Sequence, residues 1–501
     1  MFGILFLCCA GCLCLLFSQA GQYARFPLDA YYYLEMARNL ARGAGPVVRF
    51  EQGVPNKFFP GYPLLLGCGA VAAPVDVAWI WLHAALIPMC GCLMTAVLWR
   101  GGAGRIVALA AAALMVSNYD FVKWATIPYS ELAALFWGLA ACLLYLRAGR
   151  SNSVEQEQSC PRSGYARWVL PGLAAGMAVL SRPTAAILVV LLPVFDVLAA
   201  PAVSRRRMRA PAMIVFVAAA CVLPAVYLVY QRMISGQAVP YLAVFSASPD
   251  SMKPPEIFID NISKLLRQYN VNPPSALNIL IILSLMLFYG VAIPSLRGYA
   301  GRGAFLGAWA LVVYLAAHSL WYYSSERYNV LVEPVVAYLL ARGVEWLYSR
   351  NHRADQFGRW KAGFYALTIA TICLVQLLQG YYVIKDHQKA LARGAGRPRE
   401  LAQLANARPG TVWSEMGPEF AYYHAGTTYF DLDEPFFYRR TASCARDYFA
   451  RQDVRWVVTR QTPEKWFAAH PDISSGALSL RRYASDGIFT LYEVTGGKAF
   501  D

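Results

Sequence analysis

Charged side chains are scarce in this chain. Asp, Glu, Lys and Arg make up only 15% of its 501 residues, and 57% of the residues are hydrophobic. An average soluble domain carries about a quarter charged residues. So large an apolar share excludes a soluble globular protein over most of the length and predicts an integral membrane protein.

Cysteines placed to form a disulfide or a metal site are also lacking. Most of the twelve cysteines lie inside apolar runs, where cysteine acts as a small hydrophobe. Cys160 and Cys444 occur in different polar segments, so the sequence predicts neither a disulfide nor a zinc site. There is also no internal repeat of the kind that inverted-repeat transporters have.

The net charge of +15 does not indicate a nucleic-acid partner. Such a partner requires a basic stripe on one face of a domain, whereas the basic residues here gather in alternate loops between apolar runs, for example at 205–209 and 350–361. Lys and Arg concentrate on the cytoplasmic side of membrane proteins. We therefore interpret the charge as topology and expect the lipid bilayer, not nucleic acid, as a partner.

The apolar runs predict an α-helical polytopic membrane protein with about eleven transmembrane helices, each near the roughly 20 residues that cross the hydrocarbon core. The predicted spans are 2–19, 77–99, 105–121, 127–147, 166–180, 183–200, 211–231, 276–296, 304–323, 328–348 and 361–383. The pair flanking Arg182 is short, which suggests a tilted or re-entrant hairpin. No Lys or Arg precedes the first span, so we expect a retained anchor there, although its small residues permit signal cleavage.

The charge bias places the N-terminus in the cytoplasm, and an odd number of spans leaves the C-terminal segment outside. We predict a transmembrane domain at 1–383, with outer loops at about 20–76 and 232–275, and a soluble extracytoplasmic α/β domain at 384–501. The second loop is either a substrate-facing lid or a passive connector. Compact loops favour the inner (plasma) membrane of a bacterium, with an archaeal or eukaryotic source as the alternative.

The α/β assignment of the C-terminal segment follows from alternating helical and strand-like runs. The helices are expected at 399–407 and 442–451, and the strands at 411–414, 428–432, 456–459 and 489–494. Asp431 and Asp433 form a D-x-D, a spacing that nucleotide-sugar enzymes use for a divalent metal. No phosphate-binding context surrounds it, so we prefer a turn at the end of a strand.

Residues 28–40 carry the most informative pattern. Leu28, Tyr32, Met36 and Leu40 fall on one face of a helix, which predicts an amphipathic helix lying in the membrane interface. Asp29 stands at its start, where a carboxylate can accept backbone N–H groups and complements the helix dipole. On these grounds alone Asp29 is a helix cap, and a catalytic role needs further support.

That support comes from a family resemblance. Asp29, the tyrosine-rich helix after it and residues 56–65 (NKFFPGYPLL) resemble the first outer loop and following helix of GT-C glycosyltransferases, in the branch of bacterial protein mannosyltransferases and aminoarabinose transferases. The likeness continues, in the same order, at 128–131 (PYSE), 172–176 (GLAAG), 180–184 (LSRPT), 327–328 (RY) and 333–334 (EP). The chain departs from many relatives in having a single acidic residue, Asp29, where they carry two.

The resemblance implies that Asp29 acts at the catalytic centre. Glu131 is either a second catalytic residue, which orients acceptor or sugar, or half of a structural ion pair, for example with Lys123. Each cationic candidate either binds the donor phosphate or anchors a lipid headgroup; these candidates are Lys57, Arg182 and Arg327.

Four residues are secondary candidates: Tyr32, Tyr62, His318 and Glu333. A buried, hydrogen-bonded histidine is the structural alternative for His318. Neutralisation of Arg327 is the structural alternative for Glu333.

These residues permit glycosyl transfer, which needs a base for the acceptor proton and charge neutralisation on the departing phosphate. We predict transfer of a hexosyl or pentosyl group from a polyprenyl-phosphate sugar donor to a lipid, glycan or protein acceptor, with inversion at the anomeric carbon. Asp29 would be the base. Cationic side chains at the phosphate make a divalent metal optional, and no other cofactor is expected.

Three other classes remain as alternatives. A transporter would carry its charged groups near the bilayer midplane and broken helices in corresponding halves. A surface-polysaccharide polymerase or ligase shares the substrates and the long outer loops. A membrane scaffold would leave the polar residues at the outer face without a role.

Overall fold

The structure is a computed structural model of the full chain. It describes residues 1–22, 26–46, 58–150, 165–199, 206–235, 330–331, 333–350, 358–392, 398–408, 410–415, 418–425, 428–430, 454–469 and 479–495. The chain divides into two compact units, the first made of Met1–Gly21, Phe59–Tyr230 and Ser251–Lys385, the second of Gln22–Phe58, Gln231–Asp250 and Asp386–Asp501. The boundary expected after residue 383 separates residues in the membrane from residues outside it, whereas these two units are defined by compactness alone. The expected boundary therefore stays a prediction.

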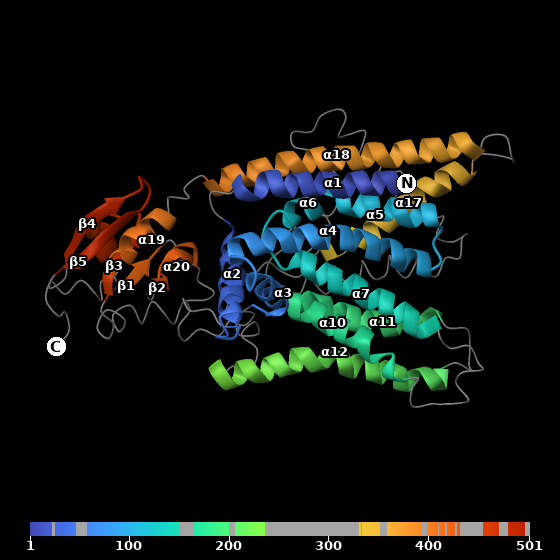
Figure 1. Cartoon of the computed structure of the whole chain (residues 1–501), viewed down its shortest axis with the longest axis horizontal. Coiled ribbons are helices and arrows are strands. Elements are labelled where there is room, and N and C mark those ends of the chain that lie inside the picture. The colour runs from blue at the N-terminus through green and yellow to red at the C-terminus, as the bar shows by residue number, and fades with distance from the viewer. Residues whose placement is uncertain are drawn as a thin grey trace. The chain divides into compact units, whose positions relative to one another are not determined.

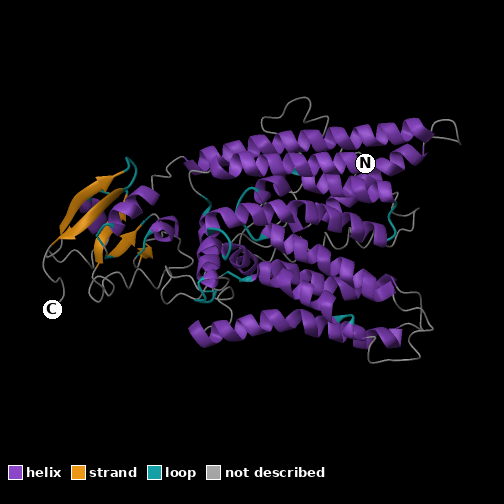
Figure 2. Cartoon of the chain, in the orientation of Figure 1, coloured by secondary structure: helices purple, strands orange, loops and turns teal. Residues whose placement is uncertain are grey.

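The described part of the first unit is mainly helical, and its long helices lie side by side (Figures 1 and 2). Its helices, long and short, are α1 (Phe2–Gln19), α3 (Gly61–Ala70), α4 (Val75–Arg100), α5 (Arg105–Ser117), α6 (Tyr119–Ala125), α7 (Glu131–Arg150), α10 (Val169–Ser181), α11 (Ala186–Ala199), α12 (Arg206–Ser235), α17 (Glu333–Arg350) and α18 (Gly358–Ala392), with a 3₁₀ turn at Pro183–Ala185. The last residues of α12 and α18 belong to the second unit.

Five helices in the described part of the chain are long and apolar enough to cross a membrane: Phe2–Gln22, Val75–Arg100, Glu131–Gly149, Pro211–Met233 and Ala362–Ala392. They confirm as apolar helices the spans predicted at 2–19, 77–99, 127–147, 211–231 and 361–383. Large apolar side chains on them, such as Phe6, Ile214 and Leu367, are more than half exposed. Such surfaces are unfavourable in water and suit contact with lipid.

The predicted span at 105–121 is not one straight helix. α5 and α6 meet at Asn118 with a bend of 56°. Asn118 is extended, with φ −56° and ψ 135°, and its side chain accepts the backbone N–H of Asp120 at 2.8 Å, which caps the new helix. The number of spans stays a prediction, because those expected at 276–296 and 304–323 lie outside the described residues, as does most of the loop expected at 232–275.

Helix α10 packs against α12 through two glycines. A Cβ on Gly172 would lie 2.4 Å from the carbonyl oxygen of Phe216, and one on Gly176 would lie 2.7 Å from that of Ala220. Lipid offers no hydrophobic force that drives helices together, so close backbone approach at small residues stabilises their contact. The spacing of these two glycines therefore fixes how α10 lies on α12.

We expect Gly172→Ala to destabilise the protein by about 1–3 kcal/mol, because the methyl group must displace helix backbone. The matched control is Gly363→Ala in α18, where a Cβ meets nothing within 4 Å; helix propensity alone makes that change neutral or stabilising. Thermal unfolding of the detergent-solubilised protein measures both. Equal Tm values for the two variants would contradict the packing argument.

The second unit contains α2 (Leu28–Ala41) and a five-stranded mixed sheet of order β2-β1-β3-β5-β4. Its remaining elements are α19 (Pro398–Asn406), β1 (Thr411–Ser414), α20 (Pro418–Tyr423), β2 (Thr428–Phe430), β3 (Val454–Thr459), α22 (Pro463–Ala469), β4 (Ser479–Ser485) and β5 (Thr490–Thr495). β1 is parallel to β2 and β3, whereas β5 is antiparallel to β3 and β4. The helix expected at 442–451 and the D-x-D lie outside the described residues.

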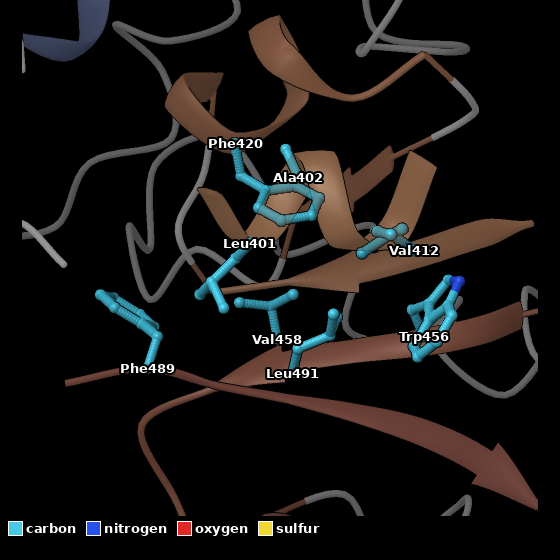
Figure 3. Close-up of a cluster of buried hydrophobic side chains, with 9 residues drawn as sticks. Leu401, Ala402, Val412, Phe420, Trp456, Val458, Phe489 and Leu491 are labelled. Atoms are coloured by element: carbon cyan, nitrogen blue, oxygen red, sulfur yellow. The ribbon is translucent and has the colours of Figure 1, made fainter. Parts of the chain in front are cut away.

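Alternation along the strands gives this sheet two buried faces. On one face β1, β3 and β5 pack against α19 and α20, through Leu401, Ala402, Val412, Phe420, Trp456, Val458, Phe489 and Leu491 (Figure 3). On the other, Trp413, Val457 and Tyr492 pack around Trp466 of α22. Side chains at i and i+1 of a strand point to opposite faces, so the consecutive apolar residues of β1, β3 and β5 serve both layers.

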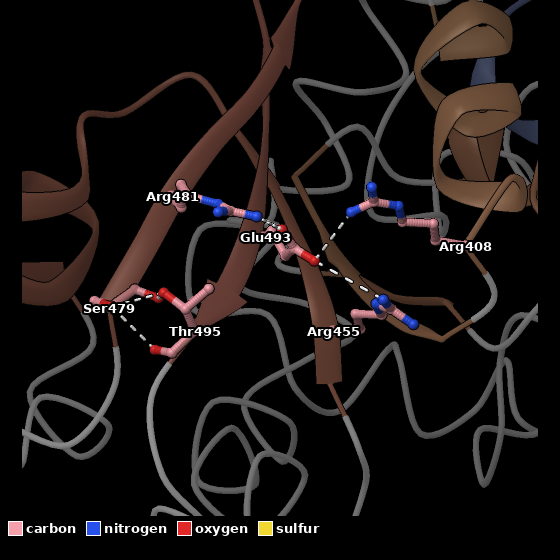
Figure 4. A network of polar contacts seen from close by, with 6 residues as sticks. All are labelled: Arg408, Arg455, Ser479, Arg481, Glu493 and Thr495. Carbon is pink, nitrogen blue, oxygen red and sulfur yellow. Dashed lines mark hydrogen bonds and ion pairs between the residues drawn. The ribbon is translucent and has the colours of Figure 1, made fainter.

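Glu493 of β5 gathers three arginines on the sheet (Figure 4). Its carboxylate lies 2.5 Å from Arg481 Nη2, 3.5 Å from Arg408 Nη1 and 3.8 Å from Arg455 Nη2. The hydrogen bond from Arg481 is the main cause that lowers the pKa of Glu493, and the charges of the three guanidinium groups act in the same direction.

Because folding lowers the pKa of Glu493, the stabilising contribution of its carboxylate is present above the ordinary glutamate pKa of about 4.3 and is lost as the pH falls below it. We expect amides of β4 and β5 to exchange faster with solvent in Glu493→Gln than in wild type at pH 7. This difference should shrink as the pH falls below about 4.3. Hydrogen exchange of the full-length protein, corrected for intrinsic rates, tests this; a difference independent of pH would contradict it.

Candidate functional site

A buried ion pair forms the centre of the candidate site in the first unit. Arg182 Nη2 lies 2.8 Å from Glu131 Oε1, and the exposed fractions of the two side chains are 7% and 1%. Both residues are sequence candidates with separate roles, and the structure brings them into contact. The alternative partner of Glu131, Lys123, is buried in α6, and its Nζ lies 4.8 Å from the ring centroid of Trp124.

The local sequence explains why these two charges meet. α10 ends at Ser181 and packs against α7, which begins at Glu131. Pro183 disfavours helical backbone at the residue before it, and Arg182 is accordingly extended, with φ −147° and ψ 117°. A cation after the end of α10 and an anion at the start of α7 each complement the dipole of their helix.

Burying two charges is costly unless they are paired with good geometry, and ionisable residues at membrane depth usually mark functional sites. A guanidinium carries five N–H donors in a planar fork. Arg182 can therefore contact Glu131 with one nitrogen and a phosphate oxygen with others. This pair offers an anion a cationic partner next to a carboxylate.

Helix α3 begins against the same turn. A Cβ on Gly61 would lie 2.5 Å from the backbone nitrogen of Ser181, so a larger residue would force α3 away from Arg182. The next residue, Tyr62, has its hydroxyl 3.0 Å from His83 Nε2, and His83 Nδ1 lies 2.8 Å from the carbonyl oxygen of Ala125. A carbonyl only accepts, so in the neutral imidazole Nδ1 donates to Ala125 and Nε2 accepts from Tyr62.

His83 is a residue that the sequence analysis missed. It is fully buried in α4 and connects the start of α3 to the end of α6, just before the turn that leads to Glu131. The signal was available, since a histidine inside an apolar span is rare and usually has a specific partner. Asp120, fully buried in α6, could have been found by the same criterion.

Four more candidates remain apart from those on α2, and the structure describes one of them. Glu333 is fully buried in the first turn of α17. Lys57, His318 and Arg327 lie outside the described residues.

Asp29 and Tyr32 belong to the second unit, on α2. Pro27 and not Asp29 is the N-cap residue, and Asp29 is a partly exposed acid in the first helical turn, where its charge complements the helix dipole as expected. Tyr32 is buried, with its ring centroid 4.9 Å from that of Phe58. The prediction of an amphipathic surface helix is wrong, because every residue from Ala30 to Ala37, Glu35 included, is buried.

Among the described residues, no group of three or more His, Cys, Asp or Glu side chains is placed to hold a metal ion. Glu131, the acid at the centre of the candidate site, is paired with Arg182 instead. The expectation that a metal is optional stays a prediction.

A scan with protein-family models finds no match, and no curated protein matches the sequence. Solved structures do match. ArnT from Cupriavidus metallidurans in the apo state aligns with a TM-score of 0.66 at 12% identity, and ArnT bound to undecaprenyl phosphate with 0.65 at 13%; each match covers 98% of both chains. The apo oligosaccharyltransferase of Archaeoglobus fulgidus aligns with 0.60 at 12% identity, over 99% of this chain and 74% of that one.

The chain has the GT-C fold. The predicted resemblance to GT-C enzymes, and to the aminoarabinose-transferase branch in particular, is thereby confirmed at the level of structure. Likeness at this identity establishes the GT-C fold, and activity has to be argued from the site residues.

We expect Glu131→Gln and Arg182→Gln each to destabilise the protein by about 3–5 kcal/mol, because each leaves one buried charge without its partner. The double variant should lose much less than the sum. The matched control is Asp386→Asn, which removes the exposed pair of Asp386 with Lys389, 3.7 Å apart, and should cost at most about 1 kcal/mol. Unfolding in detergent measures all four; strict additivity would contradict the pairing.

Proposed function

We propose that this chain is an integral membrane glycosyltransferase that moves a sugar from a polyprenyl-phosphate donor to an acceptor on the extracytoplasmic face. The observation that carries the proposal is the buried contact of Arg182 with Glu131, 2.8 Å long, in a chain with the GT-C fold. A cation and an acid side by side at helix ends are the groups that a departing phosphate and an acceptor require.

The ligands of the structural neighbours support the choice of donor. ArnT has been solved bound to undecaprenyl phosphate, and the archaeal oligosaccharyltransferase AglB with an inhibitory peptide and a dolichol-phosphate. A lipid phosphate keeps its apolar tail among the exposed apolar helix faces, such as that of Ile214, while its head group reaches polar side chains. Assays with different donors will determine whether the sugar is a hexose or a pentose. Assays with different acceptors will determine whether the acceptor is lipid, glycan or protein.

The reaction is written as one displacement. The acceptor oxygen or nitrogen attacks the anomeric carbon, and the bond from that carbon to the phosphate oxygen breaks, which inverts the configuration. Asp29 takes the acceptor proton, and the lipid phosphate leaves with the electron pair of the broken bond. Charge on that phosphate is neutralised by Lys57, Arg182 and Arg327, so that a divalent metal is not needed.

The remaining candidates orient these groups. Glu131 holds Arg182 and accepts a hydrogen bond from a hydroxyl of the sugar or acceptor. Tyr62, held by His83 at 3.0 Å, fixes the start of α3. Tyr32, His318 and Glu333 are secondary candidates for substrate contacts. The N-terminus is assigned to the cytoplasm and the C-terminal α/β domain to the outside of a bacterial inner membrane.

We expect Asp29→Asn to lower transfer of radiolabelled sugar from polyprenyl-phosphate donors by about 10²–10⁴-fold, the usual contribution of a general base. Donor binding should change little, because the amide keeps the size of the side chain. The matched control is Asp76→Asn, which changes another acid in the first turn of a helix, α4; it should leave transfer unchanged.

Each other outcome points to a different conclusion. Undiminished transfer by Asp29→Asn would remove this carboxylate from the mechanism. Absence of transfer by the wild type from every donor tested, together with substrate uptake into proteoliposomes, would favour a transporter. Extension of a glycan chain by many units would favour a polysaccharide polymerase.

A further inference from the structure

Helix α2, which carries Asp29, contacts helix α20 of the C-terminal segment within the second unit. The contact uses Tyr31 and Arg38, which lie on one side of α2 because residues seven apart return to the same face of a helix. Arg38 Nη1 donates to the carbonyl oxygen of Tyr422 at 3.1 Å, and its guanidinium carbon lies 3.9 Å from the centroid of the Tyr422 ring. The Arg38 side chain thus contacts both the backbone carbonyl and the aromatic ring of Tyr422 in α20.

Tyr31 makes a second contact with the same helix, closer to Asp29. Its ring centroid lies 5.6 Å from that of Tyr422 and 6.4 Å from that of Tyr423. The Tyr31 hydroxyl accepts the backbone N–H of Phe26 at 3.1 Å. Tyr31 therefore connects the segment that leads into α2 with α20. In the sequence, Asp29 lies between Phe26 and Tyr31, the two residues that this hydrogen bond joins.

The arginine is held in its orientation from within α2. Glu35 lies 3.1 Å from Arg38 Nη1, and Asn39 Nδ2 donates to the other oxygen of Glu35 at 3.3 Å. Glu35 is 6% exposed, so burial makes this carboxylate a strong partner for the guanidinium. A cation over an aromatic ring contributes about 0.5–2 kcal/mol, more when it is desolvated.

Helix α20 is in turn fixed to the α/β core. Phe420 is fully buried in the layer between α19, α20 and the sheet (Figure 3). Asn406 of α19 donates from Nδ2 to the carbonyl oxygen of Tyr423 at 3.0 Å, and its Oδ1 accepts the N–H of Ala425 at 2.7 Å. The helix that bears Asp29 is thus connected, within the second unit, through α20 to α19 and the sheet.

From these contacts we infer that the C-terminal α/β segment positions Asp29 for catalysis, with Arg38 and Tyr422 as the positioning residues. The inference rests on the proposed function, since it requires Asp29 to be the base. A base must lie within hydrogen-bond reach of the proton that it removes, and a misplacement of about 1 Å can cost about 10²-fold in rate. Loosening α2 therefore lowers kcat with little change in KM for the donor.

The test compares Tyr422→Ala, Tyr422→Phe and Arg38→Gln in the full-length protein. Hydrogen exchange at residues 28–41 reports whether α2 is loosened, and sugar transfer gives kcat and KM. We expect Tyr422→Ala and Arg38→Gln to speed exchange in α2 and to lower kcat by about tenfold or more. Tyr422→Phe keeps the ring and the backbone carbonyl and should stay within about twofold of wild type. Tyr483→Ala is the matched control, because Tyr483 packs on Trp456 of the sheet.

Hydrogen exchange in β1, β3 and β5 shows whether Tyr422→Ala has unfolded the α/β core. If it has, the result for Arg38→Gln decides the test, because the substituted residue then lies in α2 and not in that core. Faster exchange in α2 with wild-type kcat would overturn the inference, and so would unchanged exchange in both variants. Failure of the proposed function is seen separately, as full transfer by Asp29→Asn whatever the exchange at α2; the positioning role would then fall with it.

Discussion

The cost of placing charge among apolar helices governs the arrangement of the first unit. An ion taken from water into such surroundings loses several kcal/mol of hydration, and lipid supplies no compensating partner. Glu131 and Arg182 meet this constraint together, each at a helix end whose dipole favours its sign. The same reasoning applies to His83, whose two ring nitrogens both have partners. Polar groups thus occur as connected sets that join helices.

Glycines allow the helices to approach one another closely enough to form these polar contacts. Gly61 lets α3 approach the backbone at Ser181, next to Arg182, and Gly172 and Gly176 let α10 approach α12. The contact of Gly61 with Ser181 and the contacts of α10 with α12 all position α10, which ends next to Arg182. The ion pair therefore depends on backbone packing several residues away, and a methyl group at one of these positions would move the charge as well as the helix.

Hydropathy predicted the long helices because a lipid-facing span needs only apolar residues over a sufficient length. It did not predict the break at Asn118, since one polar residue in an apolar run gives no indication that its side chain will cap a new helix. The pairing of Glu131 with Arg182 was missed because contacts between distant segments leave no trace in local spacing. In the second unit, Trp413 and Trp456 stand in short apolar runs that predict strands. β4 (Ser479–Ser485) was missed because it is an edge strand of the described sheet and most of its side chains are exposed and polar.

The GT-C fold is shared here at only 12–13% identity over nearly the whole chain. Positions facing lipid tolerate many exchanges among Leu, Val, Ile and Phe, because only their apolar character is used, so a fold of this kind constrains few individual residues. The residues that are costly in an apolar bundle are different, since each must be offset by a specific partner. In this chain the buried Glu131, Arg182 and His83 are therefore more informative about a possible site than the apolar sequence around them, because each of them has a specific partner.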